Sequence, residues 1–329
     1  MAEKGQLMPL TRPGSSMLCR TLAASACLLL SAPGAGLAQS PSQGRPDLPP
    51  IARDDFLETR TYDLSPAGQA ATATLTVFPP QNGHASRAAV VVAPGGAYIG
   101  LAANLEGRQV ADWFAARGVT AFVLRYRHGG AAPLPVPIED GERAVRFVRA
   151  NAAALGVDAD RIGMIGFSAG GHLAAMTTAL SDNGAPTSSD PVERVSSRPD
   201  FLVLGYPWLE ATTVDVAGHS EYCRFAGFAR WSCRPEDYAA VTPLPALTTK
   251  APATFIYHTT DDGLVPVMGS VHLYTAMHEA GVDVEMHLFA HGAHGTGLGG
   301  GDPALQLWPQ ALDAWLRARG YLDKPPAGR

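Results

Sequence analysis

One serine lies in a pattern that could make it a nucleophile. Gly166-Phe-Ser-Ala-Gly170 follows an apolar run that predicts a strand, and it precedes an Ala-rich stretch to about Leu180 that predicts a helix. A tight strand-to-helix turn exposes the serine hydroxyl, and glycines two positions before and after the serine avoid side-chain collisions. The pentapeptide alone is a weak signal, because a structural Gly-Ser turn has the same letters. Its position between a strand and a helix favours a nucleophile at Ser168.

A serine nucleophile needs a base, and the base needs an acid that orients it. Asp261 and Asp262 follow one expected strand, and His291 and His294 follow the next. The carboxyl ends of parallel strands meet at one edge of a sheet, so these loops are expected near Ser168. The order serine, acid, histidine is the order found on sheets of this kind. The residues alone do not decide between the two aspartates or between the two histidines. In the sequence, a solvated loop carboxylate or a surface imidazole cannot be told from a catalytic one.

The chain beyond residue 87 alternates apolar runs with amphipathic stretches. The runs predict strands at 88–93, 119–126, 161–167, 201–206, 253–258 and 282–289. The amphipathic stretches predict helices at 106–117, 138–155, 169–180, 266–280 and 303–319. This alternation is typical of an α/β fold with a mostly parallel central sheet and helices on both faces. Residues 208–250 have no clear period and are interpreted as a small cap insertion, so 51–329 are expected to form one domain.

Seven short motifs are distributed between about residues 88 and 319. They are Pro94-Gly-Gly-Ala-Tyr98, Glu106-Gly107, Phe122-Val-Leu-Arg-Tyr126, Gly166-Phe-Ser-Ala-Gly-Gly-His172, His258-Thr-Thr-Asp-Asp262, Val265-Pro266 and Gly292-Ala-His-Gly-Thr-Gly-Leu298. Together they resemble the α/β-hydrolase superfamily of serine esterases, most of all the exported acetyl-xylan and feruloyl-type carbohydrate esterases. The resemblance implies the α/β-hydrolase fold, ester hydrolysis through an acyl-enzyme, and no cofactor.

The resemblance also separates the neighbouring candidates. In these esterases the acid commonly lies four residues before the proline of a Val-Pro pair, and Pro266 thereby selects Asp262. The base commonly lies in a Gly-x-His-Gly stretch, which selects His294. Asp261 and His291 remain the alternatives.

The same likeness implies an oxyanion hole formed by backbone N–H groups. Its donors are expected to be Ala169 and either Gly96 or Ala97. Ala97 occupies a position where the family often has glycine, but a backbone N–H survives that change. Glu106, a little further on, is interpreted as a first-turn helix carboxylate favoured by the helix dipole.

The expected cap is rich in aromatic residues, which are Trp208, Tyr222, Phe225, Phe228 and Trp231. Such residues could stack on a sugar, or they could form the small core of the cap. Tyr98, Trp208 and Trp231 are the side chains expected to contact substrate.

Charge and composition exclude some classes of protein. Lys and Arg number 25 against 30 Asp and Glu, a formal charge of −5, which does not suit a general nucleic-acid binder. His287, His291 and His294 could suggest a metal site. The expected strand at 282–289 does not give them helical spacing, so no metal is expected.

The N-terminus reads as a cleavable signal peptide, residues 1–38, that starts at Met1 or Met17. It has arginines, a short apolar stretch and small residues before the cleavage site. A membrane anchor and a lipoprotein attached through Cys27 are the alternatives. The Pro-rich residues 39–50 are interpreted as a linker, and the mature protein is expected to be secreted or periplasmic without a stable membrane anchor.

Two cysteines, Cys223 and Cys233, remain after that cleavage. An exported protein with only two cysteines, close in sequence, is expected to pair them in a disulfide. Two free buried thiols, or half of a metal site, are the alternatives.

The expected function is hydrolysis of short-chain acyl esters, with acetyl groups on plant polysaccharide or oligosaccharide as the first substrate. This expectation rests on the resemblance together with export. A serine peptidase of the same fold and a non-catalytic carbohydrate-binding or adhesion protein are the alternatives.

Overall fold

The computed structural model describes residues 60–66, 73–81, 84–209, 234–244, 246–247 and 251–322. All of them belong to one unit, Leu57–Arg329. The expected signal peptide and linker, Trp231, Cys223, Cys233 and much of the expected cap at 208–250 lie outside these residues.

Eight strands form a single sheet in the order β1-β2-β4-β3-β5-β6-β7-β8. Their bounds are β1 Thr61–Asp63, β2 Thr74–Phe78, β3 Ala89–Ala93, β4 Thr120–Arg125, β5 Ile162–Phe167, β6 Phe201–Gly205, β7 Ala253–Thr259 and β8 Val284–Phe289. All pairs from β4 to β8 are parallel, whereas β1 and β2 pair antiparallel to each other and β2 to β4. The expected α/β-hydrolase fold is confirmed, but the strands β1 and β2 were not predicted.

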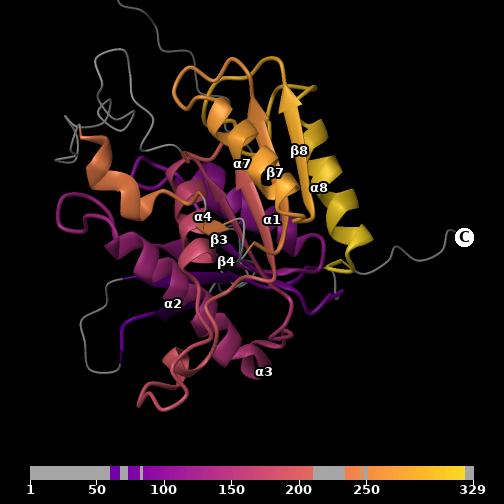
Figure 1. Ribbon diagram of the computed structural model, residues 1–329. Helices are drawn as coiled ribbons and strands as arrows, with labels where there is room; N and C mark the ends of the chain where they lie inside the picture. The colour runs from indigo at the N-terminus through magenta and orange to yellow at the C-terminus, as the bar shows by residue number, and fades with distance from the viewer. Residues whose placement is uncertain are drawn as a thin grey trace, which may run out of the picture. The chain divides into compact units, whose positions relative to one another are not determined.

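Helices cover both faces of the sheet (Figure 1). They are α1 Gln109–Ala115, α2 Val136–Ala150, α3 Ala152–Leu155, α4 Ala169–Leu180, α7 Met268–Glu279 and α8 Leu307–Ala318, with the π-helical segment η2 Ala103–Arg108 and the 3₁₀ segments η3 Pro191–Arg194 and η5 Pro235–Val241. The apolar sides of α2, α4 and α7 belong to one hydrophobic cluster and those of α1 and α8 to another. The sheet is therefore buried on both faces, which explains its continuous apolar strands. Among the described residues no helix has the length and apolar character needed to cross a bilayer.

Two expected helices are each divided in two. The stretch 138–155 breaks at Asn151, whose side chain donates to the carbonyl of Phe147 at 2.8 Å and whose backbone leaves the helical conformation. The stretch 106–117 is divided between η2 and α1. η2 is a π-helix, and Glu106 lies in its first turn and is buried.

The strand order brings the functional loops together. β3 lies between β4 and β5, so the loops that follow β3 and β5 leave neighbouring strands at the same edge of the sheet. The loops after β7 and β8 leave from that edge as well, because these strands are parallel to β5. Ligands of open α/β sheets bind at this edge.

Candidate active site

Ser168 occupies a sharp turn between β5 and α4. Its backbone has φ 53° and ψ −121°, a conformation that residues other than glycine rarely adopt. The turn needs glycine on either side, because a Cβ on Gly166 would lie 2.0 Å from the Gly170 carbonyl oxygen and one on Gly170 would lie 2.1 Å from that of Ala93. The strain aims the hydroxyl at the edge of the sheet, as a nucleophile requires.

The hydroxyl of Ser168 lies 2.8 Å from Nε2 of His294. Nδ1 of the same ring lies 2.7 Å from Oδ2 of Asp262. Because the carboxylate can only accept, Nδ1 carries the proton, and Nε2 is left to accept the hydrogen bond of Ser168. The structure thus brings together the three residues selected in the sequence, with the imidazole in the tautomer that a general base needs.

The environment of Asp262 keeps it ionised. Burial by itself would raise its pKa, but hydrogen bonds from His258 and His294 and from the backbone N–H groups of Val265 and Leu264 outweigh burial and hold the pKa well below its usual range. Its side chain is 1% exposed. A permanently charged carboxylate can stabilise the imidazolium that forms when His294 takes a proton.

The alternative pair, Asp261 and His291, lies in the same two loops but faces solvent. Nδ1 of His291 is 3.0 Å from Oδ2 of Asp261, and the two side chains are 87% and 51% exposed. Asp261 also accepts the N–H of Gly292 at 2.7 Å. This pair therefore ties the two loops together at the surface, and only His294 contacts Ser168.

The oxyanion-hole candidates lie in the loop after β3 and at the start of α4. Ala97 has a positive φ of 53°. The N–H of Ala169 belongs to the first helical turn, which has no acceptor within the helix. Gly96, Ala97 and Ser168 line one cavity, an arrangement in which backbone N–H groups can hold a developing oxyanion.

Tyr98 was expected to contact substrate, but the structure gives it a supporting place. Its side chain is 3% exposed, and its hydroxyl lies 2.7 Å from Nδ1 of His172. Nε2 of His172 faces the carbonyl of Val241 at 2.6 Å, so Nε2 carries the proton and Nδ1 accepts from Tyr98. Burial lowers the pKa of His172 to about 4, which keeps Nδ1 available as that acceptor. Tyr98 thus anchors the loop after β3 to α4, and it is not among the described residues that line the cavity at Ser168.

Glu106 has a role that the sequence analysis missed. It is 3% exposed; Oε2 accepts the N–H of Gly95 at 2.7 Å and Oε1 accepts the hydroxyl of Tyr206 at 2.8 Å. Burial raises the pKa of Glu106, and these two hydrogen bonds oppose the rise. Glu106 does lie in the first turn of a helical segment, η2, as expected. Its two buried hydrogen bonds were not predicted, because its partners are 11 and 100 residues away.

A cavity of about 230 Å³ opens at Ser168. The described residues that line it are Gly96, Ala97, Ala102, Glu106, Ser168, Trp208, Leu264, Val265 and His294. Trp208, expected to contact substrate, is therefore placed at the cavity, while Trp231 lies outside the described residues. The lining is mostly apolar apart from Ser168, His294 and Glu106, a composition typical of a site for a small uncharged group.

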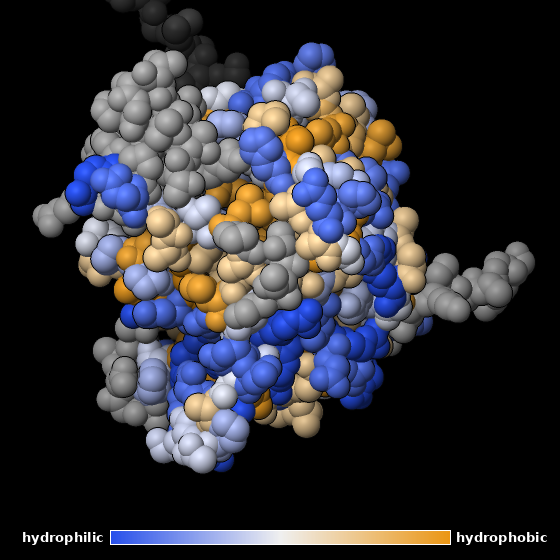
Figure 2. Space-filling view, viewed as in Figure 1, coloured by the Kyte–Doolittle hydropathy of each residue, from blue (hydrophilic) through white to orange (hydrophobic). Residues whose placement is uncertain are grey.

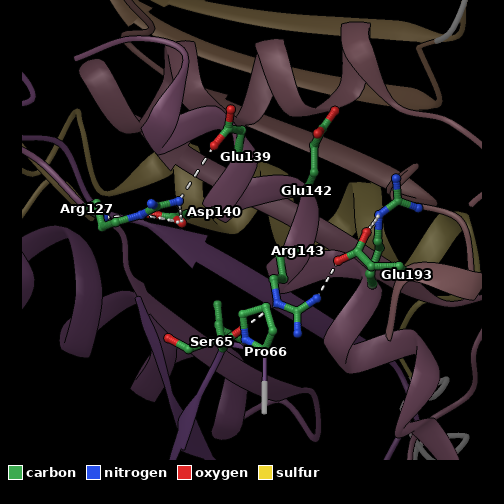
Figure 3. Close-up of a pocket in the computed structure, with 10 residues that line it drawn as sticks. Ser65, Pro66, Arg127, Glu139, Asp140, Glu142, Arg143 and Glu193 are labelled. Carbon is green, nitrogen blue, oxygen red and sulfur yellow. Dashed lines mark hydrogen bonds and ion pairs between the residues drawn. The ribbon is translucent and has the colours of Figure 1, made fainter. Parts of the chain in front are cut away.

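A larger hollow, about 380 Å³, lies beside α2 and carries different chemistry. Figure 3 shows that Arg127 points to Glu139 and Asp140, and Arg143 to Glu193. Figure 2 shows a hydrophilic band over the part of the molecule where Figure 1 places α2. The arginines in this hollow are already paired with carboxylates, so the hollow holds a surface ion-pair network.

Two solved structures of similar fold are ester hydrolases. The acetyl ester-xyloside bifunctional hydrolase from Caldicellulosiruptor lactoaceticus is 32% identical with a TM-score of 0.70, over 83% of this chain and 95% of that chain. The propionate-bound thermophilic esterase Est2 from the Planctomycetes species Thermogutta terrifontis is 26% identical with a TM-score of 0.66, over 82% of this chain and 98% of that one. The chain shares the α/β-hydrolase fold with these two ester hydrolases.

The chain belongs to the BD-FAE family, whose model matches residues 75–277. It is 30% identical over 272 residues to an acetylxylan esterase from Xylanibacter ruminicola. That alignment covers 78% of this chain and 50% of the relative, so the chain spans about half the length of that protein. The resemblance drawn from the seven motifs is thereby confirmed.

Proposed function

We propose that this protein hydrolyses short-chain carboxylic esters by acyl transfer through Ser168, with His294 as the base and Asp262 as the acid. The observation that carries the proposal is the unbroken line of hydrogen bonds, 2.8 Å and 2.7 Å, from Ser168 through His294 to Asp262 beside an apolar cavity.

In the first step His294 takes the proton of Ser168 as its oxygen attacks the ester carbonyl. The N–H groups of Ala169 and of Gly96 or Ala97 hold the resulting oxyanion, and Asp262 stabilises the imidazolium. His294 then gives its proton to the departing alcohol, which leaves an acyl group on Ser168. Water, activated by the same histidine, attacks that ester, and the acid leaves as the serine regains its proton.

The substrate proposed first is an acetyl ester of a plant polysaccharide or oligosaccharide. A cavity of about 230 Å³ lies below the range of about 300–1,000 Å³ that drug-sized ligands occupy, so a short acyl group suits it. Relatives named for acetylxylan and acetyl ester hydrolysis support the same choice. The alcohol side of a bulky substrate would extend past Trp208 toward the proposed cap.

A substrate panel tests this function. Purified protein is assayed on p-nitrophenyl acetate, butyrate and octanoate, on a peptide p-nitroanilide, and on acetylated xylan by released acetate. We expect turnover to fall with acyl length, acetate to be released, and the peptide to remain intact. Cleavage of the anilide alone would show that the protein is a peptidase and not an esterase. Binding of xylan without any turnover would show that it is a binding protein.

Export and the disulfide remain proposals that the sequence supports. The mature N-terminus, read from protein recovered outside the cytoplasm, is expected at Gln39. Intact mass after alkylation without reductant is expected to show no labelled cysteine, because Cys223 and Cys233 would be joined. Two labelled cysteines would contradict the disulfide.

A further inference from the structure

A second histidine, His258, contacts the candidate acid. It is the sixth residue of β7, and its side chain is fully buried. Its Nε2 lies 3.3 Å from Oδ2 of Asp262 and 3.2 Å from the carbonyl oxygen of Val265. The proposed acyl-transfer mechanism gives this residue no role.

The partners of the ring determine where its proton lies. Nε2 faces two oxygens, of Asp262 and Val265, that can only accept, so Nε2 carries a proton and shares it between them. On the other side of the ring, Nδ1 lies 2.8 Å from Oγ of Ser270, in the first turn of α7. Ser270 is also fully buried. The imidazole is therefore held at both nitrogens and cannot turn away from the carboxylate.

With this contact the carboxylate of Asp262 has four donors. Oδ1 accepts the backbone N–H groups of Leu264 and Val265, each at 2.9 Å. Oδ2 accepts from His294 and from His258. The two backbone donors belong to the same loop as Asp262, whereas His258 belongs to the sheet. Only His258 ties Oδ2 to a rigid element.

We propose that His258, anchored by Ser270, is a positioning residue that orients Oδ2 of Asp262 and shares its negative charge. The inference rests on the proposed function, because it treats Asp262 as the acid that orients the base. A continuous series of polar contacts runs from Ser270 through His258, Asp262 and His294 to Ser168, in which the His258–Asp262 contact is 3.3 Å long. A helix on the face of the sheet is in this way joined to the nucleophile.

The proposal has a consequence for pH dependence. A carboxylate that loses one donor concentrates its charge on the remaining partner, so the imidazolium of His294 is held more strongly. The acid limb of the kcat/KM profile then moves to higher pH, because the base keeps its proton for longer. Glu106 and Tyr206 are the other ionisable groups described near His294, and the variants at His258 leave both residues in the sequence.

Two polar variants of similar size separate orientation from packing. In His258→Gln the side-chain amide nitrogen can reach the place of Nε2 and keep the donor to Asp262. In His258→Asn the shorter amide can reach only the place of Nδ1, beside Ser270. Ser270→Ala removes the anchor, and His287→Leu removes a histidine from the neighbouring strand as a control.

On p-nitrophenyl acetate we expect His258→Asn to lower kcat by about 10- to 100-fold with little change in KM, since small displacements of catalytic groups cost this much. The acid limb of its kcat/KM profile should move to higher pH. In Ser270→Ala the same limb should move in the same direction but by less. His258→Gln should keep most of the wild-type kcat and the acid limb of the wild-type kcat/KM profile. Equal rates and equal limbs in the Asn and Gln variants would overturn the proposal. A Ser270→Ala variant with the kcat and the acid limb of wild type would also overturn the proposal, even if His258→Asn fails to fold.

A measurement without turnover separates this proposal from the proposed function. The Nδ1 proton of His294, hydrogen-bonded to Asp262, should give a far-downfield ¹H NMR signal in Ser168→Ala protein. Adding Ser270→Ala to that protein should move the signal, whereas adding His287→Leu should not. If wild-type protein hydrolyses no ester, the proposed function fails while this signal still decides the role of His258. A signal that stays in place when Ser270 is changed contradicts the positioning role.

Discussion

Glu106 and Tyr206 are joined by a buried hydrogen bond of 2.8 Å that connects the loops on the two sides of Ser168. Glu106 also holds the N–H of Gly95, next to the oxyanion loop, and Tyr206 accepts the N–H of Gly297, three residues after His294. The ring of Tyr206 lies edge-on to that of His294, with centroids 5.0 Å apart. One buried carboxylate thus supports both the proposed oxyanion hole and the proposed base.

Glu106→Gln should therefore impair chemistry more than binding. Both oxygens of Glu106 accept hydrogen bonds, and an amide can accept on one side only, so either Gly95 or Tyr206 loses its acceptor. We expect kcat on p-nitrophenyl acetate to fall by about 10- to 100-fold with KM nearly constant. Steady-state kinetics measure this, with the exposed Glu279→Gln as the matched control. A kcat equal to that of the control would remove Glu106 from the account.

The two candidate histidines should separate clearly. His294→Ala is expected to lower kcat by about 10³-fold or more, because the proposed base that contacts Ser168 is lost. His291→Ala should keep most of the activity, since its side chain is 87% exposed and its partner is Asp261. Circular dichroism checks that both variants fold. The opposite ranking would transfer the role of base to His291.

The two candidate acids form a second matched pair. In Asp262→Asn an amide meets donors on both of its sides, and the imidazole of His294 loses the partner that sets its tautomer. A loss of about 10³- to 10⁴-fold in kcat is expected. Asp261→Asn alters only a solvent-facing contact and should stay near wild type. Comparable losses in both variants would argue against assigning the acid to Asp262.

Glu142, which lines the hollow beside α2 (Figure 3), should make stability fall with rising pH. Burial raises its pKa to about 7 from 4.5; Asp182, Glu139 and Glu193 add to the rise and Arg146 opposes it. Between pH 4.5 and about pH 7 the folded protein therefore keeps a proton on Glu142 that the unfolded chain releases. The contribution of Glu142 to the free energy of unfolding is complete below about pH 4.5 and is lost as the pH rises through 7.

Glu142→Gln should abolish this part of the pH dependence. Urea unfolding at pH 5 and pH 8 is expected to show a smaller loss of stability for the variant than for wild type. Glu279→Gln, on an exposed helix end, should follow the wild-type curve. If the free energy of unfolding falls equally between pH 5 and pH 8 in Glu142→Gln and in wild type, the role given to Glu142 is contradicted.

Local patterns predicted the parallel part of the sheet and its helices well. The strands β3 and β5 are continuous runs without a charged residue, because both are buried on both faces, and that pattern is local. β1 and β2 are only partly buried and have no continuous apolar run. β1 pairs with β2, and β2 pairs with β4, which lies far along the chain. The break at Asn151 depends on a side-chain contact that letters alone do not show.

The same division holds at the candidate site. Ser168, Asp262 and His294 each follow a strand, and spacing in the family motifs was enough to choose them over their neighbours. Tyr98 was misplaced because its hydroxyl meets His172, 74 residues away. The supporting places of Glu106 and His258 likewise come from buried contacts made only when distant loops meet. Contacts between residues so far apart in the sequence can be recognised only once the fold is known.

The central claim, that Ser168 is the nucleophile, is tested most directly by covalent trapping. The protein is incubated with diethyl p-nitrophenyl phosphate, which leaves a stable phosphoryl group on an activated serine, and the modified peptide is identified by mass spectrometry. We predict one diethylphosphoryl group per chain, on Ser168, that accumulates as esterase activity is lost, and none in Ser168→Ala. Loss of activity with the group on another residue, or full activity with Ser168 modified, would contradict the account.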